Sequence, residues 1–205
     1  MSFEIGKNLH VTIYGKSHSD VIGAIIEGLP AGFEVDLDNL EAVMARRTPG
    51  AFCGSTSRRE PDRVTVTKEG TVLKLEIKNN DCRPADYEKI KTIPRPMHAD
   101  YPSWVRYGDI MSGGGFFSGR MTAPMCAAGA VCSQIAKTCG IKVGSHLLSV
   151  GTVCDTPFNP VSVSEAQLDA VKNADFPVMD GNAGKNMQKA ILVNATMVDV
   201  NILIK

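Results

Sequence analysis

The sequence predicts a chain of mixed α and β structure, and two features carry this prediction. Short apolar runs of strand character come in pairs around polar turns, at residues 10–14 and 21–28 and again at residues 63–67 and 71–77. Elsewhere, apolar residues recur at three- and four-residue spacings, which is typical of helices with one buried face. We therefore expect strands and helices to share one core.

The first predicted helix follows a break in the chain. The sequence Leu-Pro-Ala-Gly at residues 29–32 ends the second strand. Either Asp36 or Asp38 can then cap a helix that runs to Arg46 and Arg47, because Asp side chains accept hydrogen bonds from the first free N–H groups of a helix. Both alternatives place the two arginines in the last helical turn.

The middle and the C-terminal parts contain longer predicted segments. Residues 79–115 are polar and contain four prolines, which predicts a long loop, and a loop of this length in a compact domain usually has a function. Further along, a strand is predicted over residues 141–153 and a helix from about Ser164. Ser162 and Glu165 have the spacing of a capping box for that helix.

Composition indicates a soluble cytoplasmic enzyme or binding protein. A chain of 205 residues without repeats or a clear linker is long enough for one good core, so we expect a single domain over residues 1–205. The 22 Lys and Arg residues balance 22 Asp and Glu residues, which argues against nucleic acid or an anionic membrane as partner. No apolar stretch could span a bilayer, and residues 1–7 lack the order of a signal peptide. The six cysteines form no CxxC pair, so we expect reduced thiols, with no disulfide and no metal site.

One glycine-rich run carries the most information about function. Residues 113–123 read Gly-Gly-Gly-Phe-Phe-Ser-Gly-Arg-Met-Thr-Ala. The glycines allow unusual backbone angles, and Ser118 is a suitable N-cap for a helix over residues 118–139. A glycine loop that leads into a helix N-terminus suits an anion, and Arg120 would add a positive charge. The alternative is an ordinary tight turn before a core helix.

Basic residues gather in the predicted loops. His18 lies in the turn between the first two strands and His98 in the proline-rich stretch. A lone loop histidine is more often a surface residue than a catalyst, so for each the alternative is a surface position. Arg46 and Arg47 could bind an anion, or could only offset the dipole of their helix. Further loop arginines are Arg58, Arg59, Arg83, Arg95, Arg106 and Arg120. Since guanidinium groups match phosphate and carboxylate geometry, the set indicates a small polyanionic substrate.

Six sequence blocks occur in one order within about residues 5–155. They are Gly-x-Ser-His at 15–18, Arg-Arg-x-Pro-Gly at 46–50, Arg-Arg-Glu-Pro-Asp at 58–62, Asn-x-Asp-x-Arg at 79–83, Arg-Pro-x-His-Ala-Asp-Tyr at 95–101, and Gly-Gly-Gly-x-x-Ser-Gly-Arg at 113–120. In this order the blocks resemble the N-terminal half of the chorismate synthase family. The resemblance implies an α+β fold, part of a β-α-β sandwich in which an antiparallel sheet packs on helices. It also implies anti 1,4-elimination of phosphate from 5-enolpyruvylshikimate 3-phosphate, a need for reduced FMN, and a homotetramer.

The resemblance also implies roles for single residues. His18 matches the acid that protonates the departing phosphate, and His98 matches a histidine that governs protonation of the flavin. The residues implied in substrate binding are Arg46, Arg47, Ser118 and Arg120, with Arg58 and Arg59 as weaker candidates. Those implied in flavin binding are His98, Arg83, Gly113, Gly114 and Gly115.

The chain departs from the family pattern at several points. Lys16 and Ser19 replace a glutamate and a glycine beside the first histidine, Met97 replaces a glycine, and Phe116 replaces an arginine or histidine. The family is nearly twice as long, and its second half is expected to supply much of the flavin site and an aspartate base. Residues 193–205 no longer follow the family, which suggests a frameshift near residue 192.

Three functional hypotheses therefore remain open. The chain could be a truncated chorismate synthase. It could be a non-catalytic descendant that binds a phosphorylated ligand, or that pairs with a second polypeptide. It could also be an unrelated α+β binding protein.

Overall fold

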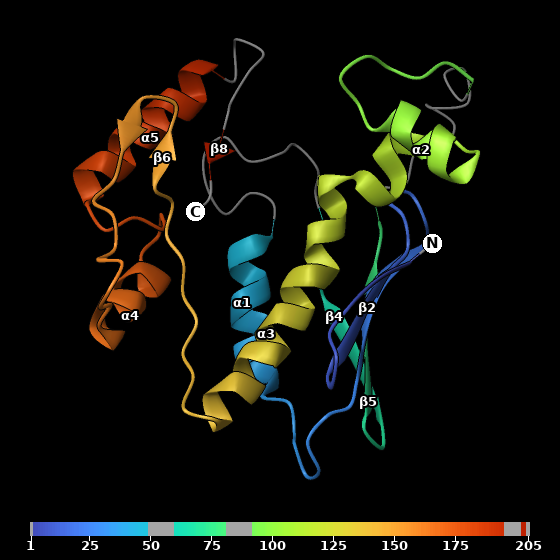
Figure 1. Ribbon diagram of the computed structural model, residues 1–205, viewed down its shortest axis with the longest axis horizontal. Helices are drawn as coiled ribbons and strands as arrows, with labels where there is room; N and C mark the ends of the chain where they lie inside the picture. Colours follow the sequence, from blue (N-terminus) through green and yellow to red (C-terminus); the bar gives the residue numbers. More distant parts are fainter. Residues whose placement is uncertain (1, 49–59, 81–91, 195–201, 204–205) are drawn as a thin grey trace. The chain divides into compact units, whose positions relative to one another are not determined.

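A computed structural model describes residues 2–48, 60–80, 92–194 and 202–203. Contacts divide the chain into two compact units, unit 1 with residues 1–51 and 57–135 and unit 2 with residues 52–56 and 136–205. The predicted α+β class is confirmed, as is the antiparallel sheet packed on helices (Figure 1). The single domain over residues 1–205 and the frameshifted tail stay predictions; most of residues 193–205 lie outside the described residues.

Unit 1 is built on a five-stranded antiparallel sheet with the strand order β1-β2-β3-β5-β4. The strands are β1 (Ser2–Ile5), β2 (His10–Tyr14), β3 (Val21–Glu27), β4 (Val64–Glu69) and β5 (Val72–Lys78). The two predicted strand pairs correspond to β2 with β3 and β4 with β5, and both are confirmed. The sequence prediction does not include β1, a short edge strand whose residues are all exposed.

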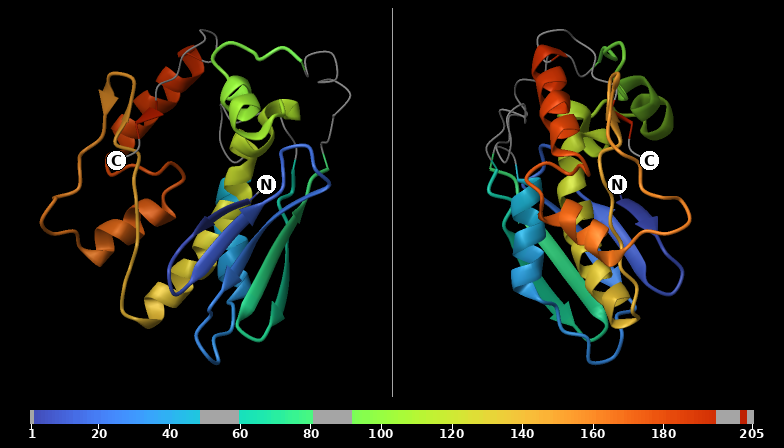
Figure 2. Two further views of the ribbon diagram at one scale, coloured as in Figure 1. Left: turned by 45° about the vertical axis from the view of Figure 1, so that its right-hand side comes forward. Right: turned by 90° about the vertical axis from the view of Figure 1, so that its left-hand side faces the viewer.

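Strand register places the apolar residues on one face of this sheet. Ile13 pairs with Ala24, which pairs with Leu75, and all three side chains are buried. Two helices, α1 (Leu37–Arg47) and α3 (Thr122–Thr138), cover this face, and the left view of Figure 2 shows the strands in front of both. Burying the alternating apolar face drives the packing, because each buried aliphatic side chain contributes about 1.5–3 kcal/mol.

The two helices begin at defined caps. Asp36, rather than Asp38, is the N-cap of α1, because its side chain accepts a hydrogen bond of 2.9 Å from the backbone N–H of Asn39. Ser118 caps the short 3₁₀ turn η3 (Gly119–Met121) that leads into α3, so the predicted cap is confirmed one turn before the α-helix begins. Small buried residues then let α3 lie close to the sheet, namely Ala123, Ala127, Ala128 and Ala130.

The long loop predicted over residues 79–115 is wrong in part, because it contains the helix α2 (Asp100–Tyr107). Pro102 lies in the first turn of this helix, where a missing N–H costs nothing, so a proline-rich sequence can still be helical. The helix ends at Gly108, which has a φ of 69°. A 3₁₀ segment, η2 (Ser112–Phe117), follows and contains the three glycines.

Unit 2 has a small core of its own. Its elements are β6 (Ser149–Val150), β7 (Val153–Cys154), α4 (Glu165–Asn173), α5 (Gly181–Asn194) and β8 (Ile202–Leu203). The core side chains Val150, Val178 and Met187 are buried together.

Two sequence predictions for unit 2 need correction. The strand predicted over residues 141–153 is limited to β6 and the start of β7, because residues 141–145 are exposed and pair with no strand among the described residues. The predicted capping box of Ser162 with Glu165 is also wrong. Ser164 and Gln167 form it instead, since each side chain accepts a hydrogen bond from the backbone N–H of the other, at 2.9 and 3.3 Å.

Candidate active site

The turn between β2 and β3 is held against the glycine run by the side chain and backbone of Ser17. Its backbone N–H donates to the carbonyl of Gly115 at 3.0 Å. Its hydroxyl lies 3.2 and 3.3 Å from the carbonyls of Ser112 and Gly113. The turn that carries His18 and the turn that carries the glycines therefore form one unit, although about 95 residues of chain separate them.

The glycines are needed because the protein itself packs against them. Gly113 has a φ of 61°, and a Cβ at this position would overlap the imidazole of His18. Gly115 has a φ of 53°, and a Cβ there would overlap the side chain of Met111. The predicted unusual backbone angles are confirmed, and the run brings the backbone directly onto His18.

A cavity of about 290 Å³ opens beside His18. It is lined by Lys16, His18, Ser19, Asp109, Ile110, Met111 and Ser112. Across it, the Lys16 ammonium lies 3.9 Å from the Asp109 carboxylate, and the two side chains are 43% and 52% exposed. The cavity thus combines an imidazole with a partly solvated cation whose partner Asp109 lies beyond hydrogen-bond distance, which is suitable for an anionic group.

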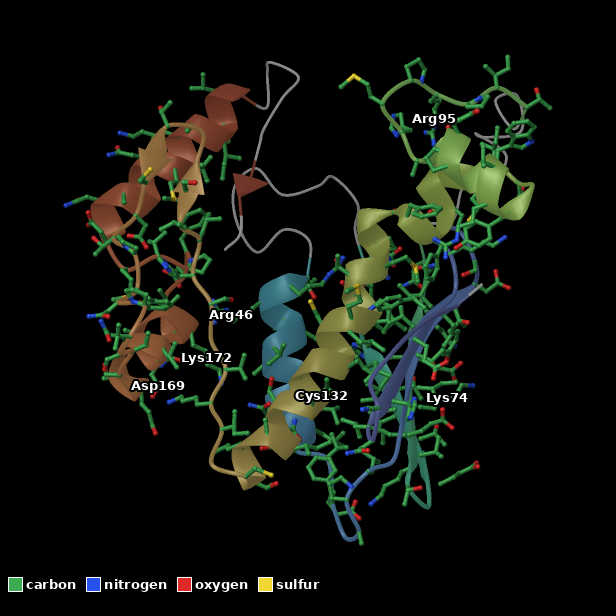
Figure 3. All side chains as sticks on the ribbon, in the orientation of Figure 1. Arg46, Lys74, Arg95, Cys132, Asp169 and Lys172 are labelled. Carbon is green, nitrogen blue, oxygen red and sulfur yellow. The ribbon has the colours of Figure 1, made fainter. Side chains whose placement is uncertain are left out.

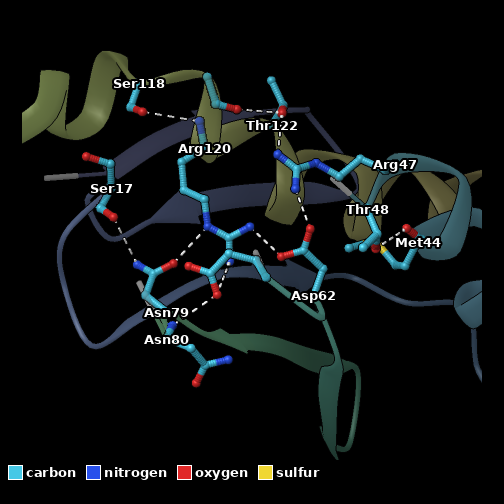
Figure 4. A network of polar contacts seen from close by, with 12 residues as sticks. Ser17, Met44, Arg47, Thr48, Asp62, Asn79, Asn80, Ser118, Arg120 and Thr122 are labelled. Carbon is cyan, nitrogen blue, oxygen red and sulfur yellow. Dashed lines mark hydrogen bonds and ion pairs between the residues drawn. The ribbon is translucent and has the colours of Figure 1, made fainter. Parts of the chain in front are cut away.

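A buried ion-pair network lies near this cavity and is centred on Arg120 (Figure 4). The Arg120 side chain is 3% exposed; its Nη1 donates to Asp62, and its Nε donates to the Asn79 amide oxygen at 2.8 Å. Its Nη2 lies 3.8 Å from a Glu60 carboxylate oxygen and has no hydrogen-bond acceptor among the described residues. Asn79 in turn donates to the carbonyl of Ser19 at 2.6 Å, which links the network to the His18 turn.

Arg47 joins the same network from the end of α1. Its Nη1 donates to the second oxygen of Asp62, and its Nη2 lies 3.2 Å from the hydroxyl of Thr122. The Asp62 carboxylate is fully buried between the two guanidinium groups. The network contains two cations, Arg47 and Arg120, and two anions, Asp62 and Glu60, so its net charge is zero. It therefore stabilises the structure beside the cavity and attracts anions only weakly.

His98 lies in a separate clamped loop of unit 1. Arg95 donates to both carboxylate oxygens of Asp100, at 2.7 and 2.9 Å, and these bonds hold the pKa of Asp100 below its usual range against the effect of burial. Met97 adopts a φ of 61°, so the backbone keeps the left-handed conformation that suits glycine, and its 96% exposed side chain causes no crowding. His98 itself is exposed and does not line the cavity beside His18.

The remaining predicted site residues are distributed as follows. Ser118 accepts a hydrogen bond from the backbone N–H of Arg120 at 3.2 Å. Arg46 is exposed on the last turn of α1, where Figure 3 labels it. Phe116 packs against the hydrophobic core of unit 1. Arg58, Arg59 and Arg83 lie outside the described residues.

The sequence alone did not assign a role to the polar partners of the arginines, Glu60, Asp62 and Asn79, or to Asp109 of the cavity. Glu60 and Asp62 were visible only as the acidic end of the Arg-Arg-Glu-Pro-Asp block, and Asn79 only as the start of the next block. The available signal was chemical, since several buried arginines require buried acceptors. Among the described residues, no group of three or more His, Cys, Asp or Glu side chains is placed to hold a metal ion.

The described residues do not by themselves fit reduced FMN. Gly113 and Gly115 are packed against His18 and Met111, so their backbones are not open to a ligand at those points. His98 is exposed in its loop and does not line the cavity beside His18. The residues gathered around the cavity suit a phosphate-sized anion better than an isoalloxazine ring.

Comparison with known proteins defines the class. A solved structure described as a chorismate synthase superposes on 93% of this chain and 54% of its own, with a TM-score of 0.66 and 19% sequence identity, which shows a shared fold. The family model for chorismate synthase matches residues 9–199. The chain belongs to the chorismate synthase family.

Individual relatives agree with this assignment. A chorismate synthase from Lancefieldella parvula is 39% identical over 90% of this chain and 54% of its own length. One from Halorubrum lacusprofundi is 35% identical over 91% of this chain and 49% of its own length. The chain thus spans about half the length of these curated relatives. Across the described part of the chain, no helix is both long and apolar enough to cross a membrane.

Proposed function

We propose that this chain takes part in the formation of chorismate by elimination of phosphate from 5-enolpyruvylshikimate 3-phosphate. The observation that carries the proposal is the position of His18, in a cavity that Lys16 also lines and with its ring packed against Gly113. Membership of the chorismate synthase family supports the same reaction.

The proposed chemistry needs an acid for the leaving group. The C–O bond to phosphate breaks, and its electron pair leaves with the phosphate. A base, which polypeptide corresponding to the other half of the relatives would supply, takes a proton from the carbon at the other end of the four-carbon unit. The electrons of that C–H bond become part of the new diene. There is therefore no net oxidation. Protonated His18 would deliver its proton to a phosphate oxygen, and imidazole is the side chain best able to exchange a proton near neutral pH.

The proposed substrate residues are those that the blocks predict: Arg46, Arg47, Ser118 and Arg120. For Arg120, Nη1 and Nε already donate to Asp62 and Asn79, whereas Nη2 is buried 3.8 Å from Glu60 and makes no hydrogen bond among the described residues, so substrate would have to displace Glu60 to reach it. A carboxylate or phosphate oxygen at this atom would receive a hydrogen bond from a fixed, buried guanidinium group, and such charge-assisted bonds are among the stronger ones in proteins.

Reduced FMN belongs to the proposal as a cofactor whose site this chain completes only in part. The sequence blocks predict His98, Arg83 and the run Gly113 to Gly115 for it. Because Gly113 and Gly115 pack against His18 and Met111, most of the flavin contacts would come from polypeptide that corresponds to the other half of the relatives. A cytoplasmic homotetramer remains the proposed state of the assembled enzyme.

The test is anaerobic turnover of 5-enolpyruvylshikimate 3-phosphate with chemically reduced FMN, following chorismate and phosphate. The chain is assayed alone and mixed with the second half of the Lancefieldella parvula relative, of which it matches 54%. We expect turnover only in the mixture. In that mixture His18→Gln should lower the rate by about 10²–10⁴, the usual contribution of a general acid.

His10→Gln is the matched control, because His10 is a β2 residue whose ring bonds to Glu4 at 3.0 Å, outside the cavity. It should leave the rate unchanged. Equal rates for the His18 variant and the unmodified chain would remove His18 from the mechanism. Binding of the substrate without turnover in the mixture would favour a phospho-ligand-binding protein instead.

A further inference from the structure

We propose that Lys16 is a specificity-determining residue of the His18 cavity, whose ammonium binds an oxygen of a phosphate monoester. The inference rests on the proposed function for the identity of that phosphate as the leaving group. Three features of Lys16 support it: a fixed backbone, a side chain that lines the cavity, and a weak ion pair.

The backbone of Lys16 is fixed on both sides. Its N–H donates to the hydroxyl of Ser19 at 2.9 Å, and its carbonyl lies 2.9 Å from the same hydroxyl and 3.3 Å from the Asn79 amide nitrogen. Lys16 and His18 are two positions apart on this turn, and both line the cavity of about 290 Å³. The turn therefore presents an ammonium and an imidazole to the same partly open cavity.

The ion pair of Lys16 is weak enough to be exchanged. Its Nζ lies 3.9 Å from Asp109, beyond hydrogen-bond distance, and both side chains are about half exposed. Exposed pairs of this kind contribute little to stability. Arg47 and Arg120 differ, because each donates a hydrogen bond to the buried carboxylate of Asp62.

A phosphate monoester is the anion that best suits this arrangement. At neutral pH it carries between one and two negative charges and has several acceptor oxygens, so it can replace Asp109 at the ammonium and accept a proton or hydrogen bond from His18. Asp109 on the opposite wall disfavours a second anionic group in the same cavity. Lys16 would then set the affinity for the phosphate end of the ligand.

The test is a titration of the complete 205-residue chain with inorganic phosphate, observed through the NMR signals of the His18 ring. We expect saturable shifts in the unmodified chain. Lys16→Met should weaken binding by about three- to tenfold, the value of one partly solvated charge-assisted contact. Lys16→Glu should abolish the response, and Asp109→Asn should strengthen binding.

Lys74→Met is the matched control. Lys74 is 46% exposed, close to the 43% of Lys16, but it lies on β5 and pairs with Glu76 at 3.0 Å (Figure 3). It should bind phosphate like the unmodified chain. Equal phosphate affinity in Lys16→Met and the unmodified chain would overturn the inference. So would the absence of phosphate-dependent shifts of the His18 signals in the unmodified chain. Lys16-dependent phosphate binding without turnover in the complemented assay would support the inference while contradicting the proposed function.

Discussion

Each unit of the molecule contains a fully buried aspartate, and the two are stabilised by different means. In unit 1, Asp62 lies between the guanidinium groups of Arg47 and Arg120. In unit 2, Asp155 accepts hydrogen bonds from the backbone N–H groups of Met179 and Asp180, at 2.6 and 2.8 Å. One carboxylate depends on opposite charge and the other mainly on backbone dipoles.

An imidazole completes the surroundings of Asp155. The Nδ1 of His146 lies 2.9 Å from its carboxylate, and the His146 ring packs on Phe158 with 4.2 Å between ring centroids. Burial by itself would raise the pKa of Asp155, but the backbone hydrogen bonds and the His146 contact outweigh it and hold the pKa below its usual range. The carboxylate thus ties the end of β7 to the start of α5.

The comparison teaches what each aspartate does. Removing the charge of Asp62 leaves buried cations without their main counter-charge, so the cost is electrostatic and extends over the whole network. Removing the charge of Asp155 weakens hydrogen bonds to groups that are themselves neutral, so the cost is smaller and local. The predictions below test this difference.

The largest effect is expected for Asp62→Asn. This change should lower the free energy of unfolding by about 3–5 kcal/mol, because Arg120 stays buried while its closest negative partner becomes neutral. Urea unfolding followed by far-UV circular dichroism measures it. Asp20→Asn, at an exposed position of the same unit, should change stability by less than about 0.5 kcal/mol. A loss below about 1 kcal/mol for the Asp62 variant would contradict the charge-based account.

A smaller and more local effect is expected for Asp155→Asn. One oxygen becomes an amide group that cannot accept a hydrogen bond, so we expect a loss of about 1–3 kcal/mol. Hydrogen exchange is the better measurement, because the amides of Met179 and Asp180 should exchange faster while those of the unit 1 sheet do not change. Faster exchange throughout both units would show that the effect is not local.

The lowered pKa of Asp155 predicts that the stability of unit 2 depends on pH. Since the pKa of Asp155 is lower in the folded chain than in the unfolded chain, its contribution is fully present above the unfolded value of about 3.9 and is lost as the pH falls through the lower folded value. Protection of the Met179 amide, corrected for intrinsic exchange, should therefore fall at acid pH in the unmodified chain. In Asp155→Asn the fall in Met179 protection at acid pH should be missing. The same pH profile in the variant and in the unmodified chain would show that Asp155 does not cause the fall.

The smallest effect is expected for Asp169→Asn. Asp169 bonds to Lys142 at 2.6 Å and raises the pKa of that lysine, but both side chains are partly exposed to solvent. Water and salt screen such pairs, so the midpoint of urea unfolding should not move measurably. A clear shift of the midpoint would mean that the contribution of a carboxylate to stability depends more on its distance to the cation than on its burial.

Sequence reasoning found those parts of the fold that local patterns determine. The alternation in β2 to β5 follows from neighbouring residues and could be predicted, whereas for the cap of α1 the sequence left Asp36 and Asp38 as alternatives that the structure decides for Asp36. The helix α2 was hidden by Pro102, because a proline in a first helical turn cannot be told from a loop proline by composition. The strand β6 has two residues, which pair locally with β7 and also with β8, more than fifty residues away, and the second pairing is not visible in a local pattern.

In the candidate site, too, local features could be predicted from the sequence and long-range contacts could not. The sequence blocks identify His18, Arg47 and Arg120, because their residue types and spacing are local information. They do not predict that Asp62 holds both arginines, since those contacts join positions 15 and 58 residues apart. The role of Lys16 likewise depends on Asp109, which only the folded chain brings near. The catalytic and binding roles of these residues stay predictions.

The link from Ser17 through Asn79 to Arg120 has a consequence for how the chain folds. Its hydrogen bonds join residues 95, 62 and 41 positions apart, so three long loops must close before the network exists. The hairpin of β4 and β5 needs only local closure and can form earlier. During synthesis, Asn79 becomes available to the His18 turn first, and we expect the full set of supports to form only after Ser112 and Arg120 have left the ribosome.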